Sequence, residues 1–309
     1  IWHFNEQAFG NLDWRAPTRI PLTSLYAARA KQLREKYDYL ILWWSGGADS
    51  TSMLQAFLHN NIALDEVFVG WPVTITEGKY TPSVDTTSSN FTSEWDLTIK
   101  PGLKWLSENY PNIKITVADT GVNMHRRDYD ESVISLTETY QYLNDQRVEA
   151  IEPIIRDRSY GGRSVANILG ISPPELHLVN NFLATYFVDL LISPFGKSDY
   201  THSGTVRKYE LFYITPDMPE LQREMAHAVL DHIKANPKLI DFLDHYEFDQ
   251  SKKLVRTFSS PYKEQKRRMF NQVYHPNYNH SGNFQANKHE FTLLTSTWWD
   301  VFYKHPDAA

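Results

Sequence analysis

Residues 39–50 read Tyr39-Leu40-Ile41-Leu42-Trp43-Trp44-Ser45-Gly46-Gly47-Ala48-Asp49-Ser50. The first six side chains are all apolar or aromatic, as in a strand of a parallel sheet that is covered on both faces. Two glycines end this strand, and residues 48–59 then repeat their apolar side chains at one-turn spacing, which predicts a helix. A strand that runs through Gly-Gly directly into a helix is the local context of a phosphate-binding loop. This stretch therefore predicts both the fold and the site.

The segments around this stretch alternate between strand and helix patterns. Residues 22–36 before it have helical spacing, and residues 66–70 and 113–118 after it have the pattern of strands. Residues 95–109 have helical spacing and are followed by Pro111. Strands and helices that alternate at this spacing indicate βαβ crossovers, so we predict an α/β fold with a parallel, doubly wound sheet.

The chain beyond Asp119 has weaker patterns. We expect further helices there at residues 132–143, 174–191, 220–234 and 238–246. We expect one short strand at residues 209–214. These patterns divide the chain into an N-terminal arm and helix, an α/β domain that contains the Gly-Gly loop, and a mainly helical C-terminal region for substrate or interaction, with bounds 1–36, 37–215 and 216–309.

Composition limits the kind of protein. The chain has 309 residues, 41% of them hydrophobic, which is enough for a sizeable core. No apolar run is long enough for a membrane span and the N-terminus lacks the pattern of a secretory signal, so we expect a cytoplasmic protein with no membrane partner. The net charge of −6 argues against a surface that attracts nucleic acid everywhere. A basic stretch with neighbouring aromatic residues, at 252–268, leaves a local nucleic-acid contact open beside the simpler reading of a solvated surface.

The loop between the strand and the helix has the chemistry of an anion site. A helix N-terminus presents unpaired N–H groups and the positive end of the helix dipole. Gly46 and Gly47 leave room for a phosphate and permit positive φ angles, while Ser45 and Ser50 add hydroxyl donors. Asp49 would repel a phosphate unless a divalent cation lies between them, so the motif also predicts Mg²⁺. The simpler alternative is an ordinary turn followed by first-turn helix residues.

The loop has the full Ser-Gly-Gly-X-Asp-Ser motif. Through this motif the chain resembles the PP-loop ATP pyrophosphatase superfamily. The resemblance implies the HUP or adenine nucleotide alpha-hydrolase-like fold. The resemblance covers about residues 37–119. It implies that the loop binds the β- and γ-phosphates of ATP with Mg²⁺, through Ser45, Gly46, Gly47, Asp49 and Ser50. It also implies that a substrate oxygen attacks the α-phosphate and that a second nucleophile displaces AMP.

The absence of cysteine narrows the reactions that this resemblance implies. With no cysteine in the chain, branches of the family that use their own thiolates for sulfur transfer, reduction or zinc binding do not fit. We therefore expect a ligase or amidating enzyme that adenylates a carboxyl or carbonyl oxygen for attack by nitrogen. The acceptor would be a small molecule, the nitrogen could come from a separate donor enzyme, and a homo-oligomer is compatible with this reading. Two alternatives stay open: an enzyme that modifies a nucleic-acid base, and an ATP-binding module without turnover.

Other candidate residues follow from the edge of the sheet where ligands bind in open α/β folds. Gly70 and Trp71 lie at the end of one strand and are candidates to hold adenine. Asp119 follows another strand and is a candidate second metal ligand or substrate contact. Lys197 lies beside Gly196 and, with Asp49, is a catalytic candidate, because a lysine could neutralise the leaving pyrophosphate.

Arginines and histidines are also present near these positions. Arg156, Arg158 and Arg163 lie near glycines and are further candidates to contact the phosphates of ATP. The histidines, His275 among them, lack the spacing of a zinc site, and we interpret them as surface or core residues.

Overall fold

In the computed structural model, the described residues are 6–71, 73, 94–119, 154, 158–171, 173–186, 200–202 and 205–278. Within them, the main sheet has six strands in the order β3-β2-β1-β4-β8-β7. Their bounds are Tyr39–Trp43 (β1), Glu66–Trp71 (β2), Lys114–Asp119 (β3), Val165–Leu169 (β4), Tyr200–His202 (β7) and Thr205–Leu211 (β8).

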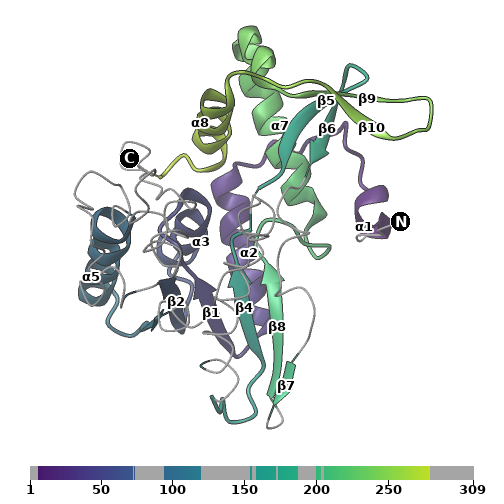
Figure 1. Cartoon of the computed structure of the whole chain (residues 1–309). Coiled ribbons are helices and arrows are strands. Elements are labelled where there is room, and N and C mark those ends of the chain that lie inside the picture. Colours follow the sequence, from purple (N-terminus) through teal and green to yellow (C-terminus); the bar gives the residue numbers. More distant parts are fainter. Residues whose placement is uncertain are drawn as a thin grey trace, which may run out of the picture.

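The five strands from β3 to β8 run parallel, and only the edge strand β7 is antiparallel to its neighbour. Hence the predicted α/β class with a parallel sheet is confirmed. The strand order reverses between β1 and β4: β2 and then β3 lie beyond β1 on one side, and β8 lies beyond β4 on the other (Figure 1). This order is compatible with a doubly wound fold, in which ligands bind beyond the carboxyl ends of the strands at the point of reversal.

Helices pack on one face of this sheet (Figure 1). They are α2 (Leu22–Lys36), α3 (Ala48–Leu58), a π-helical turn (Trp95–Ile99) that leads into α5 (Lys100–Asn109), and α7 (Pro219–Ala235), while α1 (Glu6–Gly10) is short. Successive side chains of β1 point to opposite faces of the sheet. Leu40 and Leu42 lie in the large hydrophobic cluster under these helices, and Ile41 lies in a smaller hydrophobic cluster on the other face. The continuous apolar run predicted to have both faces covered is buried on both.

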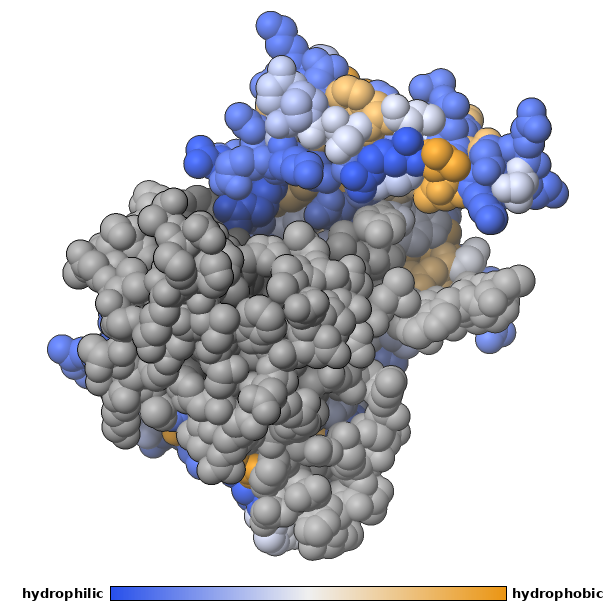
Figure 2. Space-filling view, in the orientation of Figure 1, coloured by the Kyte–Doolittle hydropathy of each residue, from blue (hydrophilic) through white to orange (hydrophobic). Residues whose placement is uncertain are grey.

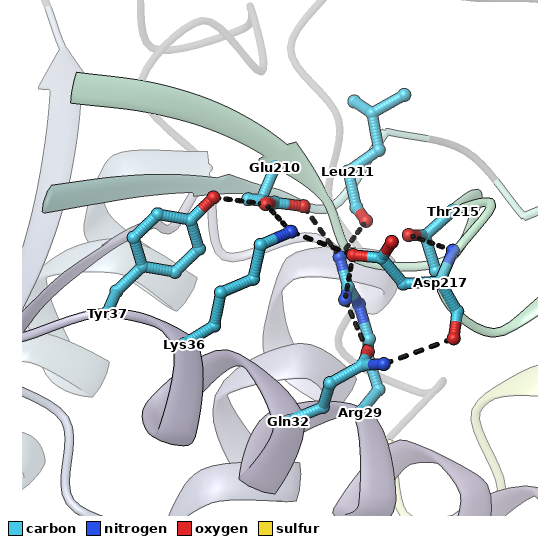
Figure 3. A network of polar contacts seen from close by, with 8 residues as sticks. All are labelled: Arg29, Gln32, Lys36, Tyr37, Glu210, Leu211, Thr215 and Asp217. Carbon is cyan, nitrogen blue, oxygen red and sulfur yellow. Dashed lines mark hydrogen bonds and ion pairs between the residues drawn. The ribbon is translucent and has the colours of Figure 1, made fainter. Parts of the chain in front are cut away.

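A buried ion pair attaches α2 to the end of β8 (Figure 3). Arg29 is fully buried, and its Nη2 lies 2.9 Å from Oε2 of Glu210. The same guanidinium donates to the carbonyl of Leu211 at 3.1 Å, and Lys36 bridges Glu210 and Asp217 at 2.9 and 2.8 Å. These contacts fix the chain at the point where it leaves β8 and approaches the phosphate loop.

A second, smaller sheet has the order β10-β9-β5-β6 in the described part of the chain. Its first hairpin joins β5 (Glu175–Val179) to β6 (Phe182–Tyr186), so the helix predicted over residues 174–191 is wrong over 174–186. Asn180 and Asn181 connect the strands with φ angles of 48° and 65°. Two residues with positive φ form the turn that a tight hairpin requires, and asparagine tolerates that conformation well.

The C-terminal region is less helical than predicted. Helix α7 confirms the prediction for residues 220–234. In place of a helix over 238–246, a 3₁₀-helix (Pro237–Phe242) is followed by the strand β9 (His245–Phe248), which pairs with β10 (Leu254–Phe258). Helix α8 (Lys263–Tyr274) follows. The helix predicted at 132–143 lies outside the described residues. Among the described residues, no helix is long and apolar enough to cross a bilayer.

Candidate functional site

The predicted phosphate loop lies at the point where the strand order reverses. Strand β1 ends at Trp43 and α3 begins at Ala48, so the loop joins the carboxyl end of a central strand to a helix N-terminus. Gly170, directly after β4, forms the facing wall: a Cβ there would lie 3.2 Å from the backbone nitrogen and Cα of Ser50. The two strands on either side of the reversal thus meet at this loop.

Hydrogen bonds inside the loop bring its two serines together. The backbone N–H of Ser45 donates to Oγ of Ser50 at 3.1 Å, and the two hydroxyl oxygens are also 3.1 Å apart. The N–H of Thr51 donates to the carbonyl of Gly47 at 3.0 Å, which is the first bond of α3. Gly47 is the N-cap, and no side chain caps the helix. The first turn of α3 therefore presents backbone N–H groups beside two hydroxyls, the arrangement that binds a phosphate.

The two glycines have different roles. Gly46 has a φ of +78°, and a Cβ there would lie 2.9 Å from Cγ2 of Thr98 in the π-helical turn. Gly47 has a φ of −72°, which any residue adopts, so the predicted positive φ holds for Gly46 alone. A Cβ at Gly47 would meet only Oγ of Ser45, at 3.4 Å. Gly46 is thus needed by the backbone, and Gly47 keeps the helix N-terminus open.

Asp49 is held from two directions by residues far along the chain. The hydroxyl of Tyr213 donates to the backbone carbonyl of Asp49 at 2.7 Å. Nε2 of His275 lies 2.7 Å from Oδ1 of the Asp49 carboxylate. Burial raises the pKa of Tyr213 well above its usual value, and the neighbouring Tyr26 and Asp49 raise it further, so its hydroxyl keeps its proton. Asp49, the residue predicted to bind the cation, is therefore contacted by Tyr213 at its backbone and by His275 at its side chain.

The residues after α8 also reach the loop. The hydroxyl of Tyr278 donates to the carbonyl of Gly46 at 3.2 Å. Burial, Glu94 and Asp49 raise the pKa of Tyr278, while Arg267 lowers it in part. Arg267 of α8 therefore acts electrostatically on Tyr278. Sequence patterns missed these contacts because nothing in the spacing of residues 267–278 relates them to residues 45–50.

Gly70 and Trp71 lie at the carboxyl end of β2, as predicted. Trp71 is buried and stacks on Trp95, with ring centroids 5.9 Å apart and an angle of 10° between the planes. Its indole belongs to the core, so any contact with adenine would come from the backbone here. Asp119 ends β3, two strands away from the loop.

The arginines proposed as phosphate contacts lie elsewhere. Arg158 pairs with Glu66, and a second of its nitrogens donates to Thr116 at 3.3 Å. Arg163 lies over the ring of Tyr39, 4.8 Å from its centroid. Tyr39 is the first residue of β1 and Glu66 is the first residue of β2, so both guanidinium groups lie at the amino ends of the strands, while the loop lies at the carboxyl ends. The prediction that these arginines contact the phosphates is therefore wrong. Arg156 and Lys197 lie outside the described residues.

No group of three or more His, Asp or Glu side chains is arranged to hold a metal ion in the described part of the chain. A magnesium ion that binds with a nucleotide needs only one or two carboxylates, because phosphates and water supply its other ligands. The partly exposed carboxylate of Asp49 beside an open helix N-terminus fits that requirement.

Comparisons with family models, curated proteins and solved structures found no match. The site must therefore be interpreted from its own geometry.

Proposed function

We propose that this chain is an ATP pyrophosphatase of the PP-loop type, with an adenine nucleotide alpha-hydrolase-like fold, that cleaves ATP to AMP and pyrophosphate. The observation that supports it most is the position of residues 45–50. They join a central parallel strand to an uncapped helix N-terminus where the strand order reverses. In open α/β sheets this is where nucleotides bind.

Each loop residue has a role in this proposal. The backbone amides at the start of α3 and the hydroxyls of Ser45 and Ser50 hold the β- and γ-phosphates. Gly46 supplies the backbone turn and Gly47 the open approach. Asp49 holds Mg²⁺, which neutralises charge on the phosphates when it is bound. The backbone at Gly70 and Trp71 contacts adenine, and Asp119 contacts the substrate or a second cation.

The reaction proceeds in two displacements. A carboxyl or carbonyl oxygen of the acceptor attacks the α-phosphorus, and the bond from that phosphorus to the bridging oxygen breaks as pyrophosphate leaves. A nitrogen nucleophile then attacks the activated carbon, loses a proton, and displaces AMP together with the acceptor's oxygen. A chain without cysteine cannot form a thiolate intermediate of its own, which favours nitrogen transfer from a free amine or a separate donor.

Product analysis tests this proposal. The protein is incubated with Mg²⁺, ATP labelled in its α-phosphate, and a pool of candidate acceptors with ammonia. We expect labelled AMP, and no AMP from Asp49→Ala. Labelled ADP would contradict the proposal. Tight ATP binding without turnover over a wide range of acceptors would support an ATP-binding module.

A second candidate is an enzyme of the same chemistry whose acceptor is a nucleic acid. Its supporting observation is the surface formed by β9, β10 and α8, which is hydrophilic with apolar patches (Figure 2). Every residue of β10 is exposed, and Arg256 stacks over the ring of Tyr246. Basic residues on this surface could contact phosphates while aromatic residues stack on bases.

Binding to labelled RNA and DNA at low and high salt tests the second candidate. Arg267→Gln with Arg268→Gln should weaken binding and lower its salt dependence by about two counterions. The matched control is Lys31→Gln with Lys104→Gln, because these exposed lysines also pair with a glutamate one turn away. No binding at low salt, or equal losses in both double variants, would remove this candidate.

A further inference from the structure

His275 lies directly behind the loop residue proposed to bind the cation. Its side chain is completely buried, and Nε2 lies 2.7 Å from Oδ1 of Asp49. A carboxylate accepts hydrogen bonds and an imidazole N–H can donate one; at 2.7 Å the two groups are in close contact, although without the alignment of a hydrogen bond. The contact joins residues that are more than two hundred positions apart in the chain.

The imidazole of His275 is fixed by the rings around it. Its centroid lies 6.0 Å from that of Tyr213, with an angle of 68° between the planes. The ring of Tyr274 lies 6.3 Å away, at 73°. Both contacts have the edge-to-face geometry that aromatic rings favour. These contacts hold the ring between two tyrosines, with Nε2 close to the Asp49 carboxylate.

The end of α8 that carries His275 is anchored independently. The hydroxyl of Tyr26 donates to the carbonyl of Tyr274 at 3.0 Å, and the hydroxyl of Tyr274 donates to the carbonyl of Pro174 at 2.6 Å. On the other side of His275, Tyr278 donates to Gly46. The segment on both sides of His275 is therefore held by contacts other than the one with Asp49.

The Asp49 carboxylate is not enclosed by this contact. Its side chain is 33% exposed, while His275 is fully buried. The imidazole approaches Oδ1 from the protein interior, which leaves carboxylate surface on the side of the solvent. A carboxylate held in this way can still bind a cation with its accessible part.

We infer that His275 is a positioning residue, which orients the Asp49 carboxylate for the cation that accompanies ATP. The inference rests on the proposed function. Partners that orient a metal-binding carboxylate typically contribute about 10- to 100-fold to metal affinity. The C-terminal region, through the end of α8, is then a part of the nucleotide site.

The test measures cation binding and uses the intact chain. Mn²⁺, which EPR detects when free, replaces Mg²⁺, and a non-hydrolysable ATP analogue is present throughout. His275→Phe keeps a ring between Tyr213 and Tyr274 but removes the nitrogen. We expect its Kd for Mn²⁺ to rise about 10- to 100-fold, while the affinity for the analogue without metal stays within about twofold. His275→Gln, which restores an N–H donor, should recover most of the loss.

His177→Phe is the control, because it removes another buried imidazole that lies beside carboxylates, those of Glu175 and Asp244, away from the loop. If it weakens Mn²⁺ as much as His275→Phe does, or if His275→Phe binds Mn²⁺ as the wild type does, the inference is wrong. If His275→Phe does not fold, His275→Leu, which is smaller and also lacks the nitrogen, takes its place with the same expected loss. A wild-type protein that binds neither the analogue nor Mn²⁺ would instead overturn the proposed function.

Discussion

Gly170 and Ser50 approach each other so closely that a Cβ on the glycine would lie 3.2 Å from the backbone nitrogen of Ser50. Gly170 follows β4, and Ser50 lies in the first turn of α3, which β1 leads into. The two residues thus come from the neighbouring strands between which the strand order reverses. Backbone atoms cannot rotate away as a side chain can, so only glycine fits at position 170 without displacement of the helix N-terminus.

Gly170→Ala should therefore displace the start of α3. We expect a loss of about 1–3 kcal/mol in the free energy of unfolding, as for other insertions of a methyl group into a packed site, together with weaker ATP binding. Urea unfolding and calorimetric titration measure the two effects. The control is Gly10→Ala, because no atom lies within 4 Å of the Cβ added there. Equal effects of the two substitutions would show that the close approach is unimportant.

Alanine at each loop glycine should separate folding from ligand binding. Gly46→Ala forces a φ of +78° on a residue with a side chain, at a cost of about 1–3 kcal/mol. Gly47→Ala, at an ordinary φ of −72°, should cost less than about 1 kcal/mol, yet its methyl group stands at the helix N-terminus and should weaken ATP binding. Unfolding curves measure the stability of both variants, and calorimetric titrations with ATP measure their affinity. A Gly47→Ala protein with wild-type affinity for ATP would mean that the phosphates do not approach this residue.

The buried pair in Figure 3 predicts a large effect on stability. Arg29→Met keeps an unbranched apolar stem and removes the guanidinium that faces Glu210. We expect a loss of about 2–3 kcal/mol in the free energy of unfolding, below the roughly 3–5 kcal/mol for a buried charge left alone, because Lys36 and Tyr37 still contact Glu210. Lys31→Met on the same helix breaks only the exposed pair with Glu35 and should cost no more than about 1 kcal/mol. Similar unfolding midpoints for the two variants would contradict this account.

Glu210 should also contribute to the pH dependence of stability. Burial alone would raise its pKa, but hydrogen bonds from Tyr37 and Lys36 and the charges of Arg29 and Lys36 outweigh burial and lower the pKa. A carboxyl group with a lowered pKa stabilises the fold above its usual pKa of about 4.3, and the stabilisation is lost as the pH falls through the lower value in the folded protein.

Glu210→Gln should therefore be less stable than the wild type at neutral pH, and it should lose less stability between about pH 5 and pH 3. Urea unfolding at several pH values measures both slopes. Parallel curves for the two proteins would show that Glu210 ionises in the folded protein as it does in the unfolded chain.

The sequence predicts the parallel sheet well because its elements are specified locally. The apolar run that ends at Trp44, the helix at residues 22–36 and the Gly-Gly turn each have a pattern that a short window contains, and the structure has these elements within a residue or two of the predicted bounds. The same local patterns misread residues 174–186. An apolar segment fits a helix or a hairpin, and only the turn at Asn180 and Asn181 distinguishes them.

The surroundings of the loop could not be predicted because they depend on contacts between distant segments. His275 lies at the end of an ordinary amphipathic helix and is not part of any spaced motif, yet it contacts Asp49. Arg158 lies near glycines in the sequence, as a phosphate contact would, but its partner is Glu66 at the amino end of β2, away from the loop. Which charged groups meet is decided by the register and order of strands, which a linear pattern does not contain.

The most direct test of the proposed phosphate loop is competition between ATP and pyrophosphate. Calorimetric titration of the wild-type protein with ATP and Mg²⁺ is repeated in the presence of pyrophosphate or of AMP. A loop that holds the β- and γ-phosphates should bind pyrophosphate in place of ATP, so pyrophosphate should compete strongly, AMP should compete weakly, and Gly47→Ala should weaken both ATP and pyrophosphate. ATP binding that pyrophosphate leaves unchanged, or a protein that binds no ATP, would contradict the central claim.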